Sequence, residues 1–315
     1  MRGEFVDLQG VRLYCYAFGH RGAGDPIVLV HGSFTSSHIW QDVLPRLPKG
    51  HRVLVLDLLG HGRSDPPAAS RAIPAATSTA TSTAASTAPD VAAARATSGA
   101  HRLTVAAHAE RLGQLLDVMG VQQAMLVGHG MGAAVAARVA HEQPARVGHL
   151  MLINPTMLAP CPADAFISRR LIRLTWLVPL WKRLAPAWLA SALHSALLPC
   201  FAHRDVGARS LDVYLKPYRL RDGRDAACRQ LLDLRDSRAD TVDTLAPGAL
   251  QCPTALVLGT TDPFLPSGRA ARLEQALRAA TNERLVLHTL PGVAHVAPEE
   301  APDRLGTLVG ELLTR

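Results

Sequence analysis

Short apolar runs recur along the first 60 residues of the chain. Glu4–Leu8 and Val11–Ala17 alternate polar and apolar positions around Gln9-Gly10, which predicts a β-hairpin. Pro26–Val30 and Arg52–Leu56 are instead continuous apolar runs. Runs of this kind are typical of strands buried on both faces, as in a parallel sheet covered by helices.

Strand-like and helix-like patterns then alternate. Strands are predicted at Ala124–Val127, His149–Ile153, Thr254–Leu258 and Arg284–Thr289, and helices at Leu103–Met119, Met131–Glu142, Ser267–Ala279 and the C-terminus. Glu300 and Pro302 are expected to start that last helix. The alternation predicts an α/β fold, with a mostly parallel sheet of about eight strands and helices on both of its faces.

Two segments interrupt this pattern. Residues 66–100 consist mainly of Ala, Thr, Ser and Pro with few charges, so they cannot bury enough surface to offset their ordering entropy, and we expect a disordered insertion. Residues 156–246 change to amphipathic patterns rich in Trp, Leu and Arg, which predicts a helical cap. The predicted core is therefore formed by residues 1–155 and 247–315.

Charge and cysteine content narrow the class of protein. The 33 Lys and Arg residues outnumber the 26 Asp and Glu residues, but they are scattered without a dense basic run, so nucleic-acid binding is not expected. The five cysteines form no paired motif, and residues 1–20 lack the apolar core of a signal peptide. Reduced thiols in the cytoplasm are the expectation.

The segment nearest in character to a membrane span is Leu184–Ala202. It contains two prolines and His194 and follows Lys182-Arg183, so cap helices are predicted there and no integral membrane segment is expected. The sequence leaves the oligomeric state open.

The most informative motif is Gly128-His129-Gly130-Met131-Gly132, between a predicted strand and a predicted helix. A strand that turns into a helix through alternate glycines is the layout of a nucleophile elbow, whose apex residue is usually Ser. Here the apex is Gly130, which has no side chain.

With three further motifs in the same order, the chain resembles the cap-bearing α/β-hydrolase fold family. These motifs are His31-Gly32, the run from Asp57 through Gly60-His61-Gly62-Arg63-Ser64, and Gly259-x-x-Asp262 with Gly292-x-x-His295. The resemblance covers nearly all of the chain except residues 66–100 and the details of the cap. It implies an α/β-hydrolase fold with the helical cap inserted after the strand that follows the elbow.

The resemblance also implies roles for individual residues. Asp262 matches the acid that orients the catalytic histidine, and His295 matches that histidine, a general base and acid. The backbone amides of Ser33 or Phe34 and of Met131 match an oxyanion hole. Asp57, His61 and Arg63 are expected to brace their loop. Candidates for lining the pocket are His31, Gly32, His129, Trp176 and Trp181.

The missing side chain at Gly130 limits the chemistry. Without an apex hydroxyl, the His295–Asp262 dyad can act only on water or on the substrate, and without an apex Asp, alkyl-enzyme routes are excluded. Ser33, Ser36 and Ser37 are candidate substitute nucleophiles, although an oxyanion loop lacks the backbone geometry of an elbow.

Three interpretations of function remain open. The first is an enzyme whose dyad acts directly on a hydrophobic small molecule, by ester hydrolysis, lyase chemistry or C–C cleavage. The second is a non-catalytic protein that binds such a ligand. The third is a serine hydrolase whose nucleophile has been replaced.

No cofactor and no metal are predicted. Residues 128–133 satisfy the dinucleotide fingerprint G-x-G-x-x-[G/A], but Asn154 stands where that fingerprint expects an acidic residue to hold the ribose. The histidines show neither H-x-x-x-H nor H-E-x-x-H spacing.

Overall fold

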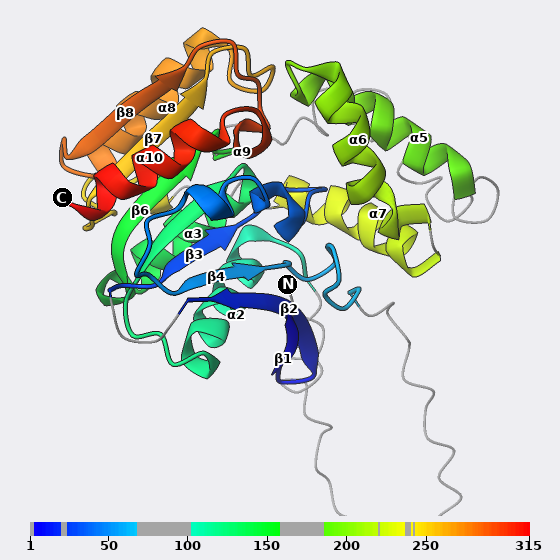
Figure 1. Cartoon of the computed structure of the whole chain (residues 1–315), viewed down its shortest axis with the longest axis horizontal. Helices are drawn as coiled ribbons and strands as arrows, with labels where there is room; N and C mark the ends of the chain where they lie inside the picture. The colour runs from blue at the N-terminus through cyan, green and yellow to red at the C-terminus, as the bar shows by residue number, and fades with distance from the viewer. Residues whose placement is uncertain are drawn as a thin grey trace, which may run out of the picture.

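The computed structural model describes residues 3–19, 24–67, 102–157, 186–219, 221–236, 241 and 243–315. Eight strands form one sheet in the order β1-β2-β4-β3-β5-β6-β7-β8 (Figure 1). The strands are β1 (Glu4–Leu8), β2 (Val11–Phe18), β3 (Ile27–Val30), β4 (Val53–Leu56), β5 (Ala124–His129), β6 (Val147–Ile153), β7 (Thr254–Gly259) and β8 (Leu285–Leu290).

The pairing is antiparallel at one edge and parallel elsewhere. Strand β2 pairs antiparallel with both β1 and β4, and every pair from β4 to β8 is parallel. All residues of β3 and β4 are buried, as their continuous apolar runs predicted, and so are all residues of β5 and β7. The predicted fold class is confirmed.

Helices cover the sheet on both faces. Helix α3 (Met131–Glu142) packs on β5 and β6 and beside α2 (Val105–Val118), and α8 (Ser267–Ala280) packs on β8. Helix α10 (Pro302–Leu313) lies in front of the sheet in Figure 1 and contacts the short helix η2 (Leu44–Arg46). The other short helices of the core are η1 (Ser37–Trp40), η3 (Pro144–Arg146), η9 (Asp243–Leu245) and α9 (Ala297–Glu300).

Three longer helices group at one side of the molecule, to the right in Figure 1. They are α5 (Pro186–Leu197), α6 (Arg204–Leu215) and α7 (Arg221–Asp236), with the short helices η6 (Leu198–Cys200) and η7 (Pro217–Arg219) between them. All of them fall within the segment predicted to form a cap. The predicted insertion at 66–100 lies outside the described residues from residue 68 onward.

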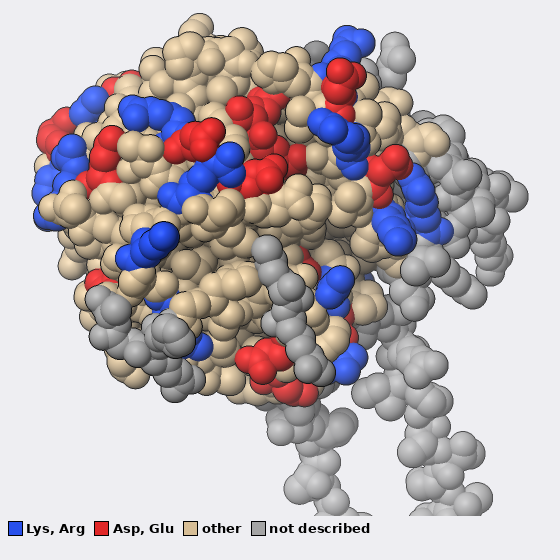
Figure 2. Space-filling model, in the orientation of Figure 1, with Lys and Arg blue, Asp and Glu red and all other residues tan. Residues whose placement is uncertain are grey.

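Three further features of the described residues bear on other classes of function. In the part of the chain that the structure describes, no helix combines the length and apolar character needed to cross a membrane. No group of three or more His, Cys, Asp or Glu side chains in these same ranges is arranged to hold a metal ion. Basic and acidic side chains are interspersed over the face shown in Figure 2.

Candidate active site

The turn from β5 into α3 is shaped by its glycines. Gly130 has φ 55° and ψ −117°, and its backbone N–H donates to Ile153 O at 3.0 Å. A Cβ at Gly128 would lie 2.4 Å from Ala133 Cα, and one at Gly132 would lie 2.3 Å from Val30 O. Only glycine fits at these two flanking positions, because strand, helix and neighbouring strand approach so closely.

The apex glycine has different surroundings. A Cβ at Gly130 would lie 3.3 Å from His295 Nε2 and 3.6 Å from Gly32 Cα, which is close but not a clash with backbone. The positive φ is the main strain that a larger residue would meet there. Gly130 is therefore not required by packing, and the missing side chain leaves a space that faces the His295 imidazole.

His295 and Asp262 meet at the ends of two neighbouring strands. Asp262 follows β7 and His295 follows β8, and His295 Nδ1 lies 2.8 Å from Asp262 Oδ2. The other carboxylate oxygen, Asp262 Oδ1, accepts from Phe264 N at 2.8 Å. With the proton of the imidazole on Nδ1 toward the carboxylate, Nε2 is left as an acceptor that faces Gly130.

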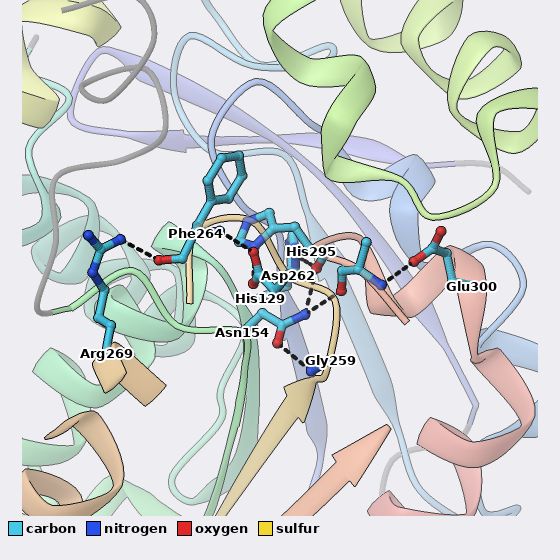
Figure 3. Close-up of polar contacts among 9 residues, drawn as sticks. His129, Asn154, Gly259, Asp262, Phe264, Arg269, His295 and Glu300 are labelled. Atoms are coloured by element: carbon cyan, nitrogen blue, oxygen red, sulfur yellow. Dashed lines mark hydrogen bonds and ion pairs between the residues drawn. The ribbon is translucent and has the colours of Figure 1, made fainter. Parts of the chain in front are cut away.

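Asn154 braces this pair from the end of β6. Its Nδ2 donates to Ala294 O and His295 O at 2.9 and 2.8 Å, and its Oδ1 accepts from Gly259 N at 2.8 Å (Figure 3). One amide thus fixes both loops that carry the dyad. From the sequence, Asn154 was interpreted only as a residue standing where a dinucleotide site needs an acid. Its position directly after a buried strand was the available signal, because Asn tolerates the left-handed φ of 42° found there.

Glu300 has a role that differs from the predicted one. It was expected to start the C-terminal helix, but α10 begins at Pro302. The Glu300 carboxylate accepts from Ala294 N at 2.7 Å and from Ala202 N at 2.6 Å. It therefore ties the His295 loop to the segment between η6 and α6, two segments that are far apart in the sequence.

A pocket lies in front of the dyad. Four of the predicted site residues besides His295 line it, namely Ser33, Phe34, His129 and Met131. The remaining lining residues are mostly apolar and come largely from α5, η6 and α6 and from the loops around the dyad: Thr35, Thr156, Leu197, Cys200, Phe201, Leu211, Tyr214, Phe264 and Val296. Phe264 packs edge-on against the His295 ring at 4.8 Å between centroids. The nine lining residues in this list were not predicted as site residues, because no sequence motif marks them.

His31 does not line this pocket. Its side chain is fully buried, its Nδ1 donates to Gly32 O at 2.8 Å, and its Nε2 accepts from Leu58 N at 2.9 Å. It holds two loops together below the pocket. Gly32 lies beside Gly130 without lining the cavity, while Trp176 and Trp181 lie outside the described residues.

His129 sits against the dyad as a neutral ring. Its Nε2 donates to His295 O at 2.9 Å, and the two rings lie 4.8 Å apart. Burial, and then the nearby positive charge that His295 can carry, lower the pKa of His129 well below its usual value. The ring therefore adds no charge to the pocket at neutral pH.

Backbone amides are available on the opposite side of the pocket. Met131 is the first residue of α3, so its N–H has no acceptor within the helix, and the helix dipole favours negative charge there. Phe34 is buried with a left-handed φ of 57°, which shapes the loop after Gly32. Ser36 and Ser37 do not line this pocket, and Ser36 Oγ accepts from His38 N at the start of η1.

Residues 25–302 of the chain match the family described as alpha/beta hydrolase fold, and the chain belongs to this family. It is similar to an alpha/beta hydrolase fold protein from Burkholderia ambifaria (TM-score 0.71, 23% identity, covering 99% of this chain and 97% of that one). It is also similar to the enol-lactonase from Burkholderia xenovorans LB400 (TM-score 0.70, 19% identity, covering 99% and 100%). At these identities the likeness shows the fold alone.

Two proteins that are similar to the chain in sequence match different shares of it. An uncharacterized protein of Mycobacterium tuberculosis is 30% identical over 149 residues, which cover 47% of this chain and 34% of that protein. The chain thus spans about a third of the length of that relative. Haloalkane dehalogenase 2 of Mycobacterium bovis is 24% identical over 301 residues, covering 92% of this chain and 88% of the dehalogenase.

Proposed function

We propose that this chain is a hydrolase that cleaves small, neutral, apolar carbonyl compounds, esters or lactones, without forming an acyl-enzyme. One observation carries the proposal. His295 Nδ1 lies 2.8 Å from Asp262 Oδ2, and the Nε2 of the same ring faces the empty side-chain position of Gly130, 3.3 Å from where a Cβ would lie. A water in that position would be within reach of a general base.

In the proposed reaction the carbonyl oxygen of the substrate accepts hydrogen bonds from Met131 N–H and from the N–H of Ser33 or Phe34. His295 Nε2 takes a proton from the water as the water oxygen attacks the carbonyl carbon. The imidazolium is stabilised by Asp262 and then gives the proton to the leaving oxygen. One water is consumed, and a carboxylic acid and an alcohol are formed, or a hydroxy acid from a lactone.

The substrate class follows from the lining of the pocket. No Asp, Glu, Lys or Arg side chain lines it within the described ranges, and its walls are largely Phe, Leu, Met and Val. A charged substrate would lose hydration there without a partner. The presence of an esterase and an enol-lactonase among the similar structures agrees with this substrate class but does not identify the substrate.

The test is a comparison of wild type with His295→Ala and Asp262→Asn on a panel of p-nitrophenyl esters and small lactones. Wild type should hydrolyse at least one of them, and His295→Ala should lower kcat by about 10²–10⁴-fold, the usual contribution of a general base. A binding protein without catalysis would instead show a shift in melting temperature with such ligands and the same background rate in all three proteins. That result would reject the proposal.

A further inference from the structure

A second cavity, about 380 Å³ in volume, lies near the site. It shares no lining residue with the Gly130 pocket, although the two are lined by consecutive parts of the same loop: Ser33–Thr35 line the pocket, and Ser36–His38 line the second cavity. Helix α6 likewise contributes Leu211 and Tyr214 to the pocket and Val213 to the second cavity. We call the second cavity the Arg63 groove. Its volume is in the range of cavities that hold small molecules.

The Arg63 groove has an excess of positive charge. Arg63 and Lys216 both line it and are both exposed, and neither forms an ion pair with any described residue. Arg63 Nη1 donates to the hydroxyl of Tyr14 at 3.0 Å, and the guanidinium lies over the Tyr14 ring, which fixes the side chain without neutralising it. Two cations at one cavity that pair with no described carboxylate favour the binding of an anion there.

The acid that lines the groove is already occupied. Asp57 is 1% exposed, its Oδ1 accepts from Ser37 N at 2.7 Å, and its Oδ2 accepts from Arg63 N at 2.9 Å. These bonds are the loop bracing that was predicted for Asp57 and Arg63. They fix the backbone of Ser37 and Arg63 and leave the Arg63 guanidinium at the groove.

The remaining walls are suited to an apolar body. The rings of Tyr16 and Phe18, from β2, are stacked with centroids 6.3 Å apart and planes 9° apart. Leu44 and Val213 add aliphatic surface, and Val213 is 45% exposed. Partly buried aromatic and aliphatic side chains beside cations that pair with no described acid are the two halves of a site for an amphipathic anion.

We propose that the Arg63 groove binds an organic carboxylate with an aromatic or aliphatic body. The carboxylate lies between the Arg63 guanidinium and the Lys216 ammonium, and the body lies on Tyr16 and Phe18. The hydrolysis proposed for the His295 pocket does not use this site, so each proposal stands without the other.

Isothermal titration calorimetry with 4-phenylbutanoate tests the inference, with 4-phenylbutan-1-ol as the neutral analogue and inorganic phosphate as an anion without an apolar body. Wild type should bind one 4-phenylbutanoate, more tightly than either comparison compound, and added salt should weaken the binding. Arg63→Gln combined with Lys216→Gln should weaken it roughly tenfold or more, a difference of about 1.4 kcal/mol. Val213→Glu, on an exposed position of the groove, should weaken it as well.

The matched control is Lys49→Gln combined with Arg272→Gln, which removes the same two charges from exposed positions outside the groove. It should bind as wild type does. The inference is overturned if 4-phenylbutanoate does not bind, if the alcohol binds equally well, or if the groove variants and the control pair behave alike. Because the three groove positions do not line the His295 pocket, binding of the acid in that pocket would leave all variants unchanged.

Discussion

At the scale of single residues, the glycines near the candidate site divide into two kinds. Gly128, Gly132 and Gly259 are sites where a Cβ would lie within 2.4 Å of backbone atoms, so their identity is dictated by packing. Gly130 meets no backbone atom closer than 3.6 Å and is bounded by a single imidazole. The glycine at position 130 is therefore a property of the sequence that the fold does not impose.

Gly130→Ser should fold, with the free energy of unfolding lowered by roughly 1–3 kcal/mol because a non-glycine residue must adopt the positive φ. Urea unfolding measures the change. Gly128→Ser is the matched control, since its Cβ would meet Ala133 Cα at 2.4 Å, and it should lose more than about 4 kcal/mol or fail to fold. Equal losses in the two variants would show that the turn is not the one described.

Asn154 offers a second test at this scale, because its amide makes three hydrogen bonds to the dyad loops and does not line the pocket. Asn154→Asp keeps the acceptor for Gly259 N but cannot donate to the carbonyls of Ala294 and His295. It should lose on the order of 2 kcal/mol of stability, about 1 kcal/mol for each lost bond, and lower kcat with little change in KM. If activity is unchanged while stability falls, Asn154 supports the fold alone.

At the scale of elements, the strands and the longer helices could be predicted from the sequence, because their hydrophobic positions repeat with a regular period. The helix at Met131–Glu142 was predicted with its observed bounds, and the eight strands were predicted to within two residues at each end. The short helices η1 and η2 were missed because three or four residues cannot show a helical period. Asp262 and His295 were located through their glycine motifs, whereas Asn154 and the pocket residues of the cap carry no motif that a single sequence can reveal.

The contact of helix α6 with α9 contains a partly buried carboxylate whose protonation can be tested. Glu299 accepts from Ser210 Oγ and Tyr214 Oη, and burial raises its pKa to about 6. The unfolded chain has a Glu pKa of about 4.3. Because the folded-state pKa is higher, Glu299 contributes its full stability below about pH 4.3, and this contribution is lost as the pH rises through 6. Glu299→Gln, which resembles the protonated form, should therefore gain stability relative to wild type between pH 4.5 and 7, by about 2 kcal/mol.

Thermal or urea unfolding of both proteins across this pH range measures the difference. Glu274→Gln, at a partly buried i,i+4 pair with Arg278 on α8, is the control and should show little change with pH. A constant difference between Glu299→Gln and wild type would mean that Glu299 is ionised throughout this range.

At the scale of the whole molecule, buried histidines set the response to acid. Burial lowers the pKa of His31 to about 4 and of His61 to about 3, and lowers that of His108 well below its usual value. The unfolded chain binds more protons than the folded one below about pH 6.5. Stability should therefore be full above pH 6.5 and fall as the pH drops toward 3, with roughly 3 kcal/mol from His31 alone.

His108→Leu separates this effect from general acid denaturation. Neither ring nitrogen of His108 has a hydrogen-bond partner among the described residues, and the ring packs near His61. The variant should be at least as stable as wild type at pH 7 and should lose less stability than wild type between pH 6.5 and 4. Parallel pH curves for the two proteins would contradict this assignment.

The central claim is that the His295–Asp262 dyad acts on water above a glycine, without a covalent intermediate. Rapid-quench mass spectrometry of the intact protein during turnover of p-nitrophenyl acetate tests it most directly, with wild type and Gly130→Ser side by side. The account predicts turnover by wild type with no acetylated protein, and one acetyl group on residue 130 of Gly130→Ser, which is lost when His295 is also replaced by Ala. Acetylation of wild type at Ser33 or another side chain, or no turnover by wild type of any ester or lactone, would contradict it.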